Sequence, residues 1–189
     1  MAPAPPQRRR ISAPEVPEAV ISSVILAVSC LVTYWLVTNI LTHIYSVSSA
    51  DDSLGGMWAV IAAIFVFRDS HEQSAAAALS RMAATSVSFV LCLAYLLILP
   101  PDVWGMAALI GLGALFVTLI GRSGDAVTTG ITTTVVMVVA SLSPHDAWQQ
   151  PILRFFDTVI GIAVGLAAAW ISLRAGRRAA RATHGTSTS

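Results

Sequence analysis

The sequence contains no lysine and few charged residues of any kind. All eleven basic residues are arginines, and charged residues make up only 11% of the 189 residues, against roughly 25% in soluble domains. Apolar residues reach 56%, and the mean hydropathy is +0.75. Without lysine there is no Gly-Lys phosphate loop, and the Ser, Cys and His residues form no nucleophile motif, so neither an ATP-driven pump nor a hydrolase is indicated. The composition predicts an integral membrane protein.

Cysteine and histidine are also scarce. Cys30 and Cys92 each lie inside an apolar run, which favours small buried residues over a disulfide or a metal pair. No two of the four histidines have the spacing of metal ligands; they are His43, His71, His145 and His184. We therefore expect no metal and no cofactor. The short arginine groups lie beside apolar segments, where they indicate membrane topology and not nucleic-acid binding.

Six apolar segments separated by polar turns predict an all-α fold of six transmembrane helices, because a bilayer-spanning helix needs about 20 residues. The predicted spans are residues 20–44, 55–67, 74–99, 103–120, 126–141 and 152–173. Together they form a membrane domain at 18–173, between a disordered cytoplasmic tail at 1–17 and an arginine-rich cytoplasmic tail at 174–189. Ser74 is expected to cap the third helix, and Pro100-Pro101 to end it. Spans two and five are the shortest.

The arginines predict the orientation of the chain. If the N-terminus is cytoplasmic, ten of the eleven arginines fall in inner segments, as the positive-inside rule requires. These ten are Arg8, Arg9, Arg10, Arg68, Arg81, Arg122, Arg174, Arg177, Arg178 and Arg181. Trp58, Trp104 and Trp148 then fall at the outer interface and Trp170 near the inner one, which are the usual places for amphipathic rings. Both termini are expected in the cytoplasm.

Arg154 is the exception, and an internal repeat explains it. The octets that begin at Arg81 and Arg154 both read Arg-x-x-x-Thr-x-x-small before an apolar run. If spans one to three and four to six are two copies of one unit, the odd number of spans turns the second copy upside down. Arg81 then lies at the inner face and Arg154 at the outer face. A chance match of two common residue types is the alternative.

Three motifs carry a resemblance to a known family. They are Gly56-Met57-Trp58-Ala59, Arg81-x-x-x-Thr85, and Arg154-x-x-Asp157-Thr158-x-x-Gly161. Over residues 20–173 the chain resembles the fusaric acid resistance and aromatic acid exporter family of bacterial membrane transporters. Ala84 and Ser88 depart from the family pattern, which has glycine near this arginine.

The resemblance implies a multi-pass protein of the bacterial inner membrane that exports aromatic and related carboxylic acids at the expense of the proton gradient. Many members contain two six-span units with cytoplasmic domains, so a single unit such as this one is expected to form a homo-oligomer among membrane lipids. The expected partners are those lipids, further copies of the chain and a small organic acid, with no nucleic acid.

Four residues are candidates for the site. Arg81 and Arg154 would attract a carboxylate, Thr132 would line a polar path, and Asp157 would exchange protons, because an ionisable residue within a span is costly. Counting back from the predicted helix ends places Arg81 near the inner interface and Arg154 near the outer one. The alternative is that both arginines snorkel to lipid phosphates. Asp157 would then only pair with Arg154, its neighbour at i and i+3.

The leading function is therefore ion-coupled export of small organic acids, aromatic acids included. The alternative is a membrane scaffold or accessory subunit that transports nothing, and an enzyme is not expected. Thr132 could equally donate its hydroxyl to its own helix, as threonine commonly does in membranes. Gly161-x-x-x-Gly165 predicts a close helix contact, within the chain or between subunits.

Overall fold

The computed structural model describes residues 15–41, 49–142 and 147–185, with side chains placed over 19–39, 53–142 and 147–176. Apart from short turns between the helices, this described part of the chain is helical and contains no strand, which confirms the all-α prediction. The helices are α1 (Glu15–Leu36), the π-helical η1 (Val37–Leu41), α3 (Ser49–Val66), α4 (His71–Leu96), α5 (Val103–Leu119), the 3₁₀-helical η2 (Ser123–Asp125), α6 (Ala126–Leu142) and α7 (Gln149–Gly185). The tail predicted at 1–17 lies mostly outside the described residues. The helix α7 continues well past the predicted end of span six.

Four helical segments are long and apolar enough to cross a membrane. They are Ala19–Asn39, His71–Leu96, Ser123–Leu142 and Gln149–Gly176. Two further apolar helices, Ser53–Val66 and Val103–Leu119, are shorter than the roughly 20 residues that a 30 Å hydrocarbon core requires. The chain is therefore a multi-pass membrane protein. The short helices are the second and the fourth. The prediction that spans two and five are the shortest is therefore confirmed for span two and wrong for span five, which η2 extends at its start.

Helix boundaries follow from local caps. The N-cap of α4 is Ser70, whose hydroxyl accepts a hydrogen bond from the Gln73 N–H at 3.2 Å, as an N-cap oxygen does. Ser74, the predicted cap, lies instead in the first turn, where its buried hydroxyl accepts a hydrogen bond from the Arg68 N–H. The helix ends at Leu96, before the two prolines, and Asp102 caps α5 through the Gly105 N–H at 2.7 Å.

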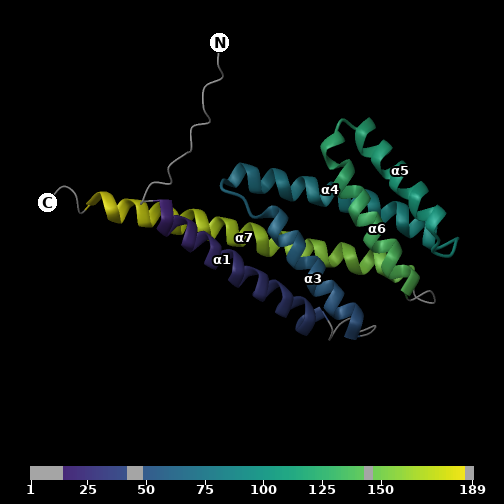
Figure 1. Cartoon of the computed structure of the whole chain (residues 1–189), viewed down its shortest axis with the longest axis horizontal. Helices are drawn as coiled ribbons and strands as arrows, with labels where there is room; N and C mark the ends of the chain where they lie inside the picture. Colours follow the sequence, from purple (N-terminus) through teal and green to yellow (C-terminus); the bar gives the residue numbers. More distant parts are fainter. Residues whose placement is uncertain (1–14, 42–48, 143–146, 186–189) are drawn as a thin grey trace, which may run out of the picture.

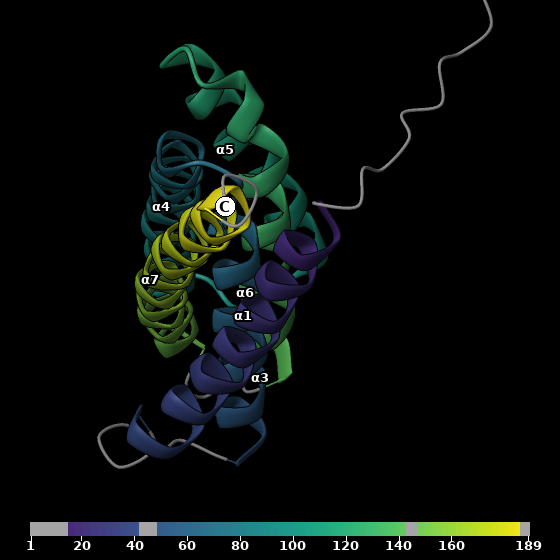
Figure 2. The ribbon, with the colours of Figure 1, turned by 90° about the vertical axis from the view of Figure 1, so that its left-hand side faces the viewer.

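The helices α4 and α7 pack against each other and form one side of the bundle (Figure 1 and Figure 2). The helix α7 contacts α1, α3, α4 and α6, whereas α4 contacts α3, α5, α6 and α7. The helix α1 lies at one flank and α5 at the other, and the view from the end places α1 against α3 and α7 (Figure 2). Side chains of α4 and α7 that face α3 or α6 are therefore covered by those helices.

The closest helix contact joins α3 to α7 through glycines. A Cβ atom added at Gly161 would lie 2.2 Å from the carbonyl oxygen of Ala59, and one added at Gly165 would lie 2.7 Å from that of Ala63. Ala59 and Ala63 are themselves fully buried. Small residues on both helices let the backbones meet, as they commonly do in membrane bundles. The Gly161-x-x-x-Gly165 face is therefore used inside the chain.

Candidate functional site

A buried polar face runs along the first part of α7. Its four members are all at most 2% exposed; they are Gln150, Arg154, Asp157 and Thr158. Residues spaced by three or four positions share one face of a helix, and this face meets α3 and α4. The apolar residues of the same helix, such as Phe156 and Val159, point outward. The first half of α7 is thus apolar toward lipid and polar toward the centre of the bundle.

Arg154 and Asp157 form an ion pair within this face. The distance from Arg154 Nη1 to Asp157 Oδ2 is 3.1 Å, and both side chains are almost completely buried. This confirms the pairing predicted from their i, i+3 spacing. Gly55 of α3 makes room for the carboxylate, because a Cβ atom there would lie only 3.0 Å from Asp157 Oδ2. The ion pair is thus enclosed by a second helix and does not face lipid headgroups.

Trp58 connects α3 to the same polar face. Its indole N–H donates to the Thr158 hydroxyl at 3.0 Å, and that hydroxyl donates to the Arg154 carbonyl oxygen at 2.8 Å. Trp58, expected at the outer interface as an amphipathic ring, is buried against the other helices in the middle of α3, where its N–H has a partner. Trp104, Trp148 and Trp170 are exposed on the surface of the bundle.

Arg81 is the most unusual side chain of the site. It is 2% exposed, and its Cζ lies 4.9 Å from the ring centroids of both Trp58 and Phe65. Its Nε and Nη2 are buried without a hydrogen-bond partner, and so is the hydroxyl of Thr85, one turn further along α4. Because α4 begins at His71, Arg81 lies about 15 Å along the helix. Trp58 therefore joins the surroundings of Arg81 to those of Arg154.

Thr132 lies on the buried face of α6 but not in this cluster of contacts. Its hydroxyl donates to the Thr128 carbonyl oxygen at 2.9 Å, so the alternative that it bonds its own helix is confirmed. Its neighbours Thr129 and Thr133 hold α6 to α4: Ser88 donates to the Thr129 carbonyl oxygen at 3.0 Å and accepts from the Thr133 hydroxyl at 3.1 Å. The threonines of α6 thus serve helix packing first.

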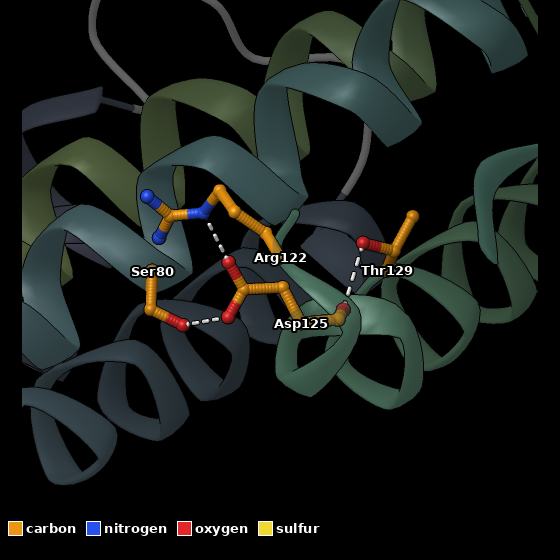
Figure 3. Close-up of polar contacts among 4 residues, drawn as sticks. All are labelled: Ser80, Arg122, Asp125 and Thr129. Carbon is orange, nitrogen blue, oxygen red and sulfur yellow. Dashed lines mark hydrogen bonds and ion pairs between the residues drawn. The ribbon is translucent and has the colours of Figure 1, made fainter. Parts of the chain in front are cut away.

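A second polar cluster, which the sequence analysis missed, joins α4 to the start of α6. The Asp125 carboxylate accepts a hydrogen bond from the Ser80 hydroxyl and forms an ion pair with Arg122 Nε at 2.6 Å (Figure 3). The backbone carbonyl oxygen of Asp125 accepts a hydrogen bond from the Thr129 hydroxyl. Arg122 and Asp125 are spaced i, i+3, like Arg154 and Asp157, and that spacing was the available signal. Asp125 is buried although it follows the turn at Gly121, whose φ is +78°.

The arrangement can bind an anion and hold a proton. Arg81 offers unpaired N–H groups in a site shielded from solvent, where charge interactions are stronger than in water. Arg154 cannot release its proton, so within its ion pair only the Asp157 carboxylate can exchange one. Among the described residues no group of three His, Cys, Asp or Glu residues could hold a metal ion. Neither Cys92, which is buried, nor Cys30 is in a disulfide.

Comparison with known proteins gives one match. The model of a family described as fusaric acid resistance protein-like matches residues 33–168, from the last turn of α1 to the second half of α7. No curated protein and no solved structure matches the chain. The matched segment contains Arg81, Arg154, Asp157 and Trp58, and it covers more than half of the sequence. The chain therefore belongs to the fusaric acid resistance protein-like family, whose function is related to membrane transport.

Proposed function

We propose that the protein exports small organic carboxylic acids, aromatic acids included, across the bacterial inner membrane, and that proton entry drives the export. One observation carries this proposal: Arg81, Arg154 and Asp157 are each at most 2% exposed, inside an apolar bundle, and Trp58 contacts the surroundings of both arginines. In this proposal Arg81 and Arg154 bind the carboxylate and Asp157 exchanges the proton. Thr132, whose hydroxyl donates to its own helix, contributes only the buried face of α6 beside the path.

The energetic cost of these residues supports a functional role. Burying an ionised side chain costs several kcal/mol, and contact with two aromatic rings returns about 0.5–2 kcal/mol for each ring. Arginines that served only to anchor the protein would instead extend to lipid phosphates, where the cost is small. A bundle packed only for assembly gains more from apolar residues of similar volume at these positions.

The pattern of helix contacts supports an inverted repeat. Suppose that α1, α3 and α4 correspond to α5, α6 and α7. Each helix contact then has a counterpart in the other half: α3–α7 corresponds to α6–α4, α1–α3 to α5–α6, α1–α7 to α5–α4, and α3–α4 to α6–α7. All eight contacts are present. The α4–α7 contact corresponds to itself, as it would on a two-fold axis. In transporters with inverted repeats the substrate site lies near the midplane, between the repeats.

Individual contacts follow the same correspondence. Superposing the octets at Arg81 and Arg154 pairs Ser88 with Gly161. Gly161 packs against the Ala59 carbonyl of α3, and Ser88 donates to the Thr129 carbonyl of α6. The two positions thus make the same helix contact in the two halves, one by close approach and one by a hydrogen bond. In this repeat Arg81 and Arg154 occupy equivalent positions, and a substrate would reach the two arginines from opposite sides of the membrane.

Uptake into proteoliposomes tests the proposed function. The full chain is reconstituted, and a pH gradient is imposed in the direction that the chain experiences in cells. We expect gradient-dependent movement of benzoate or fusaric acid above that of protein-free vesicles, corrected for passive diffusion of the protonated acid. Benzyl alcohol, which lacks the carboxylate, should show no protein-dependent movement. If no acid moves faster than in empty vesicles, the scaffold alternative is favoured.

A further inference from the structure

We infer that the Nε and Nη2 atoms of Arg81, together with the Thr85 hydroxyl, form a site for one carboxylate group of a free small acid. This inference rests on the proposed function and assigns its substrate contact to particular atoms. Arg81 was a candidate from the sequence, whereas the unpaired hydroxyl of Thr85 and the binding geometry come from the structure.

The two unpaired nitrogens of Arg81 belong to one edge of the guanidinium. On this edge the Nε–H bond and one Nη2–H bond run side by side, and their separation matches that of the two oxygens of a carboxylate. The rings of Trp58 and Phe65 lie over the guanidinium, with Cζ 4.9 Å from each centroid. A ligand therefore meets the edge, and the side-on, two-bond contact is the strongest that it can make there.

Thr85 differs from the other threonines of the spans in how it uses its hydroxyl. Thr132, Thr134 and Thr158 each donate to the carbonyl oxygen four residues earlier. The Thr85 hydroxyl is buried and has no partner. Since a hydroxyl that could bond its own helix usually does so, its orientation away from the backbone leaves one donor available to a ligand.

The two groups lie on the same face of α4. Residues at i and i+4 have Cβ atoms about 6 Å apart, so a carboxylate bound by Arg81 can also receive the Thr85 hydroxyl. Thr158, at the equivalent position of the second octet, already accepts a hydrogen bond from Trp58. The site at Arg81 is therefore the open one, while Arg154 already has the Asp157 carboxylate.

The polar atoms of this site are sealed from solvent in the present conformation. A ligand can reach them only when α3 moves relative to α4. The α3–α4 contact is less extensive than the α3–α7 contact, which Gly161 and Gly165 hold together. Acid binding should therefore favour an arrangement in which α3 and α4 lie further apart.

Binding of benzoate to the purified full chain in phosphatidylcholine nanodiscs tests the inference, with benzamide as the uncharged probe of similar shape. We expect benzoate to bind and benzamide to bind at least tenfold more weakly, because a hydrogen bond to a charged group is worth more than a neutral one. Arg81→Lys keeps the charge without the side-on edge and should weaken benzoate binding about tenfold. Thr85→Val should weaken it about fivefold.

The matched control is Thr134→Val, which removes a hydroxyl that bonds its own helix and should leave benzoate binding unchanged. Each variant is first checked for a single elution peak and a normal unfolding temperature; if Arg81→Lys does not fold, Thr85→Val alone decides. The inference is overturned if benzoate does not bind, if benzamide binds equally well, or if a folded Arg81→Lys or Thr85→Val variant binds as the wild type does. If benzoate binds as expected but the protein transports no acid, the proposed function is refuted and the binding site stands. If Arg81→Lys and Thr85→Val both transport acid as the wild type does, the binding site is refuted and the proposed function stands.

Discussion

Trp58 and Thr158 lie 100 residues apart in the sequence and share a buried hydrogen bond of 3.0 Å between the indole N–H and the hydroxyl. The same indole ring lies under the guanidinium of Arg81. One side chain of α3 therefore contacts the functional faces of both α4 and α7. A movement of α3 would disturb Arg81 and the Arg154 turn together, which is a physical route for coupling between them.

Trp58→Phe should destabilise the fold while keeping an aromatic ring at the site. The substitution removes the indole N–H and leaves the buried Thr158 hydroxyl without its donor, at a cost of about 1–2 kcal/mol. Reversible unfolding in mixed micelles measures this change. Trp104→Phe is the matched control, because Trp104 is exposed on the surface of the bundle. Equal stability of the two variants would contradict the structural role of Trp58.

Gly161→Ala should force α3 and α7 apart. The added Cβ atom would lie 2.2 Å from the backbone oxygen of Ala59, which cannot move without the helix. Overpacking of this kind costs about 1–3 kcal/mol or more. Gly111→Ala is the control, because a Cβ atom at Gly111 meets nothing within 4 Å. The measurement is the fraction of each variant that elutes as a single species after solubilisation, and we expect a loss only for Gly161→Ala.

Stability should depend on the pH through Asp102, which lies between α4 and α5. The Tyr95 hydroxyl and the Gly105 N–H both donate to Oδ1 at 2.7 Å, and these bonds hold the pKa of Asp102 below its ordinary value. A lowered pKa in the folded state means that the contribution to stability is complete above the unfolded-state pKa. It is lost as the pH falls through the folded-state pKa.

Asp102→Asn should therefore lower stability at neutral pH and flatten its dependence on acidic pH. The measurement is the unfolding midpoint of the wild type and the variant from pH 7 down to pH 3. If the two curves stay parallel over this range, Asp102 makes no contribution through its charge.

The sequence predicted the helices well where the chain gives sharp local signals. The span predicted at 126–141 is the helix Ala126–Leu142, and the span predicted at 103–120 is the helix Val103–Leu119. These limits were predictable because glycine turns and prolines mark the ends of both spans. The start of α4 was misplaced since Ser70 and Ser74 both suit a cap, and only the geometry of the Arg68 loop distinguishes them.

The site was predictable in part. Charged residues within apolar segments identified Arg81, Arg154 and Asp157, because few other features explain a charge there. The role of Trp58 was not predictable, because a tryptophan near a span end suits the interface equally well, and only packing against Thr158 gives it an interior place. Asp125 was missed for a similar reason. It follows a polar turn, and its burial depends on Ser80 of another helix.

The orientation of the chain is a separate prediction. The placement of the arginines predicts that both termini are cytoplasmic, and the described helices give six crossings if the two short ones also span. A reporter fused after Ser189 should therefore be active in its cytoplasmic form. A periplasmic signal at that position would remove the six-span arrangement, and with it the inverted repeat.

The central claim is that the Asp157 carboxylate couples proton movement to acid movement, and the Asp157→Asn variant tests it most directly. The variant keeps the size of the side chain but cannot ionise, and it leaves Arg154 without its counter-charge, at a cost of about 3–5 kcal/mol if nothing replaces it. Variant protein that still reconstitutes is assayed in proteoliposomes for gradient-driven uptake and for exchange of labelled benzoate at equal pH. We predict that gradient-driven uptake is lost while exchange is retained. Gradient-driven uptake equal to that of the wild type would contradict the claim and leave Asp157 as a partner of Arg154 only.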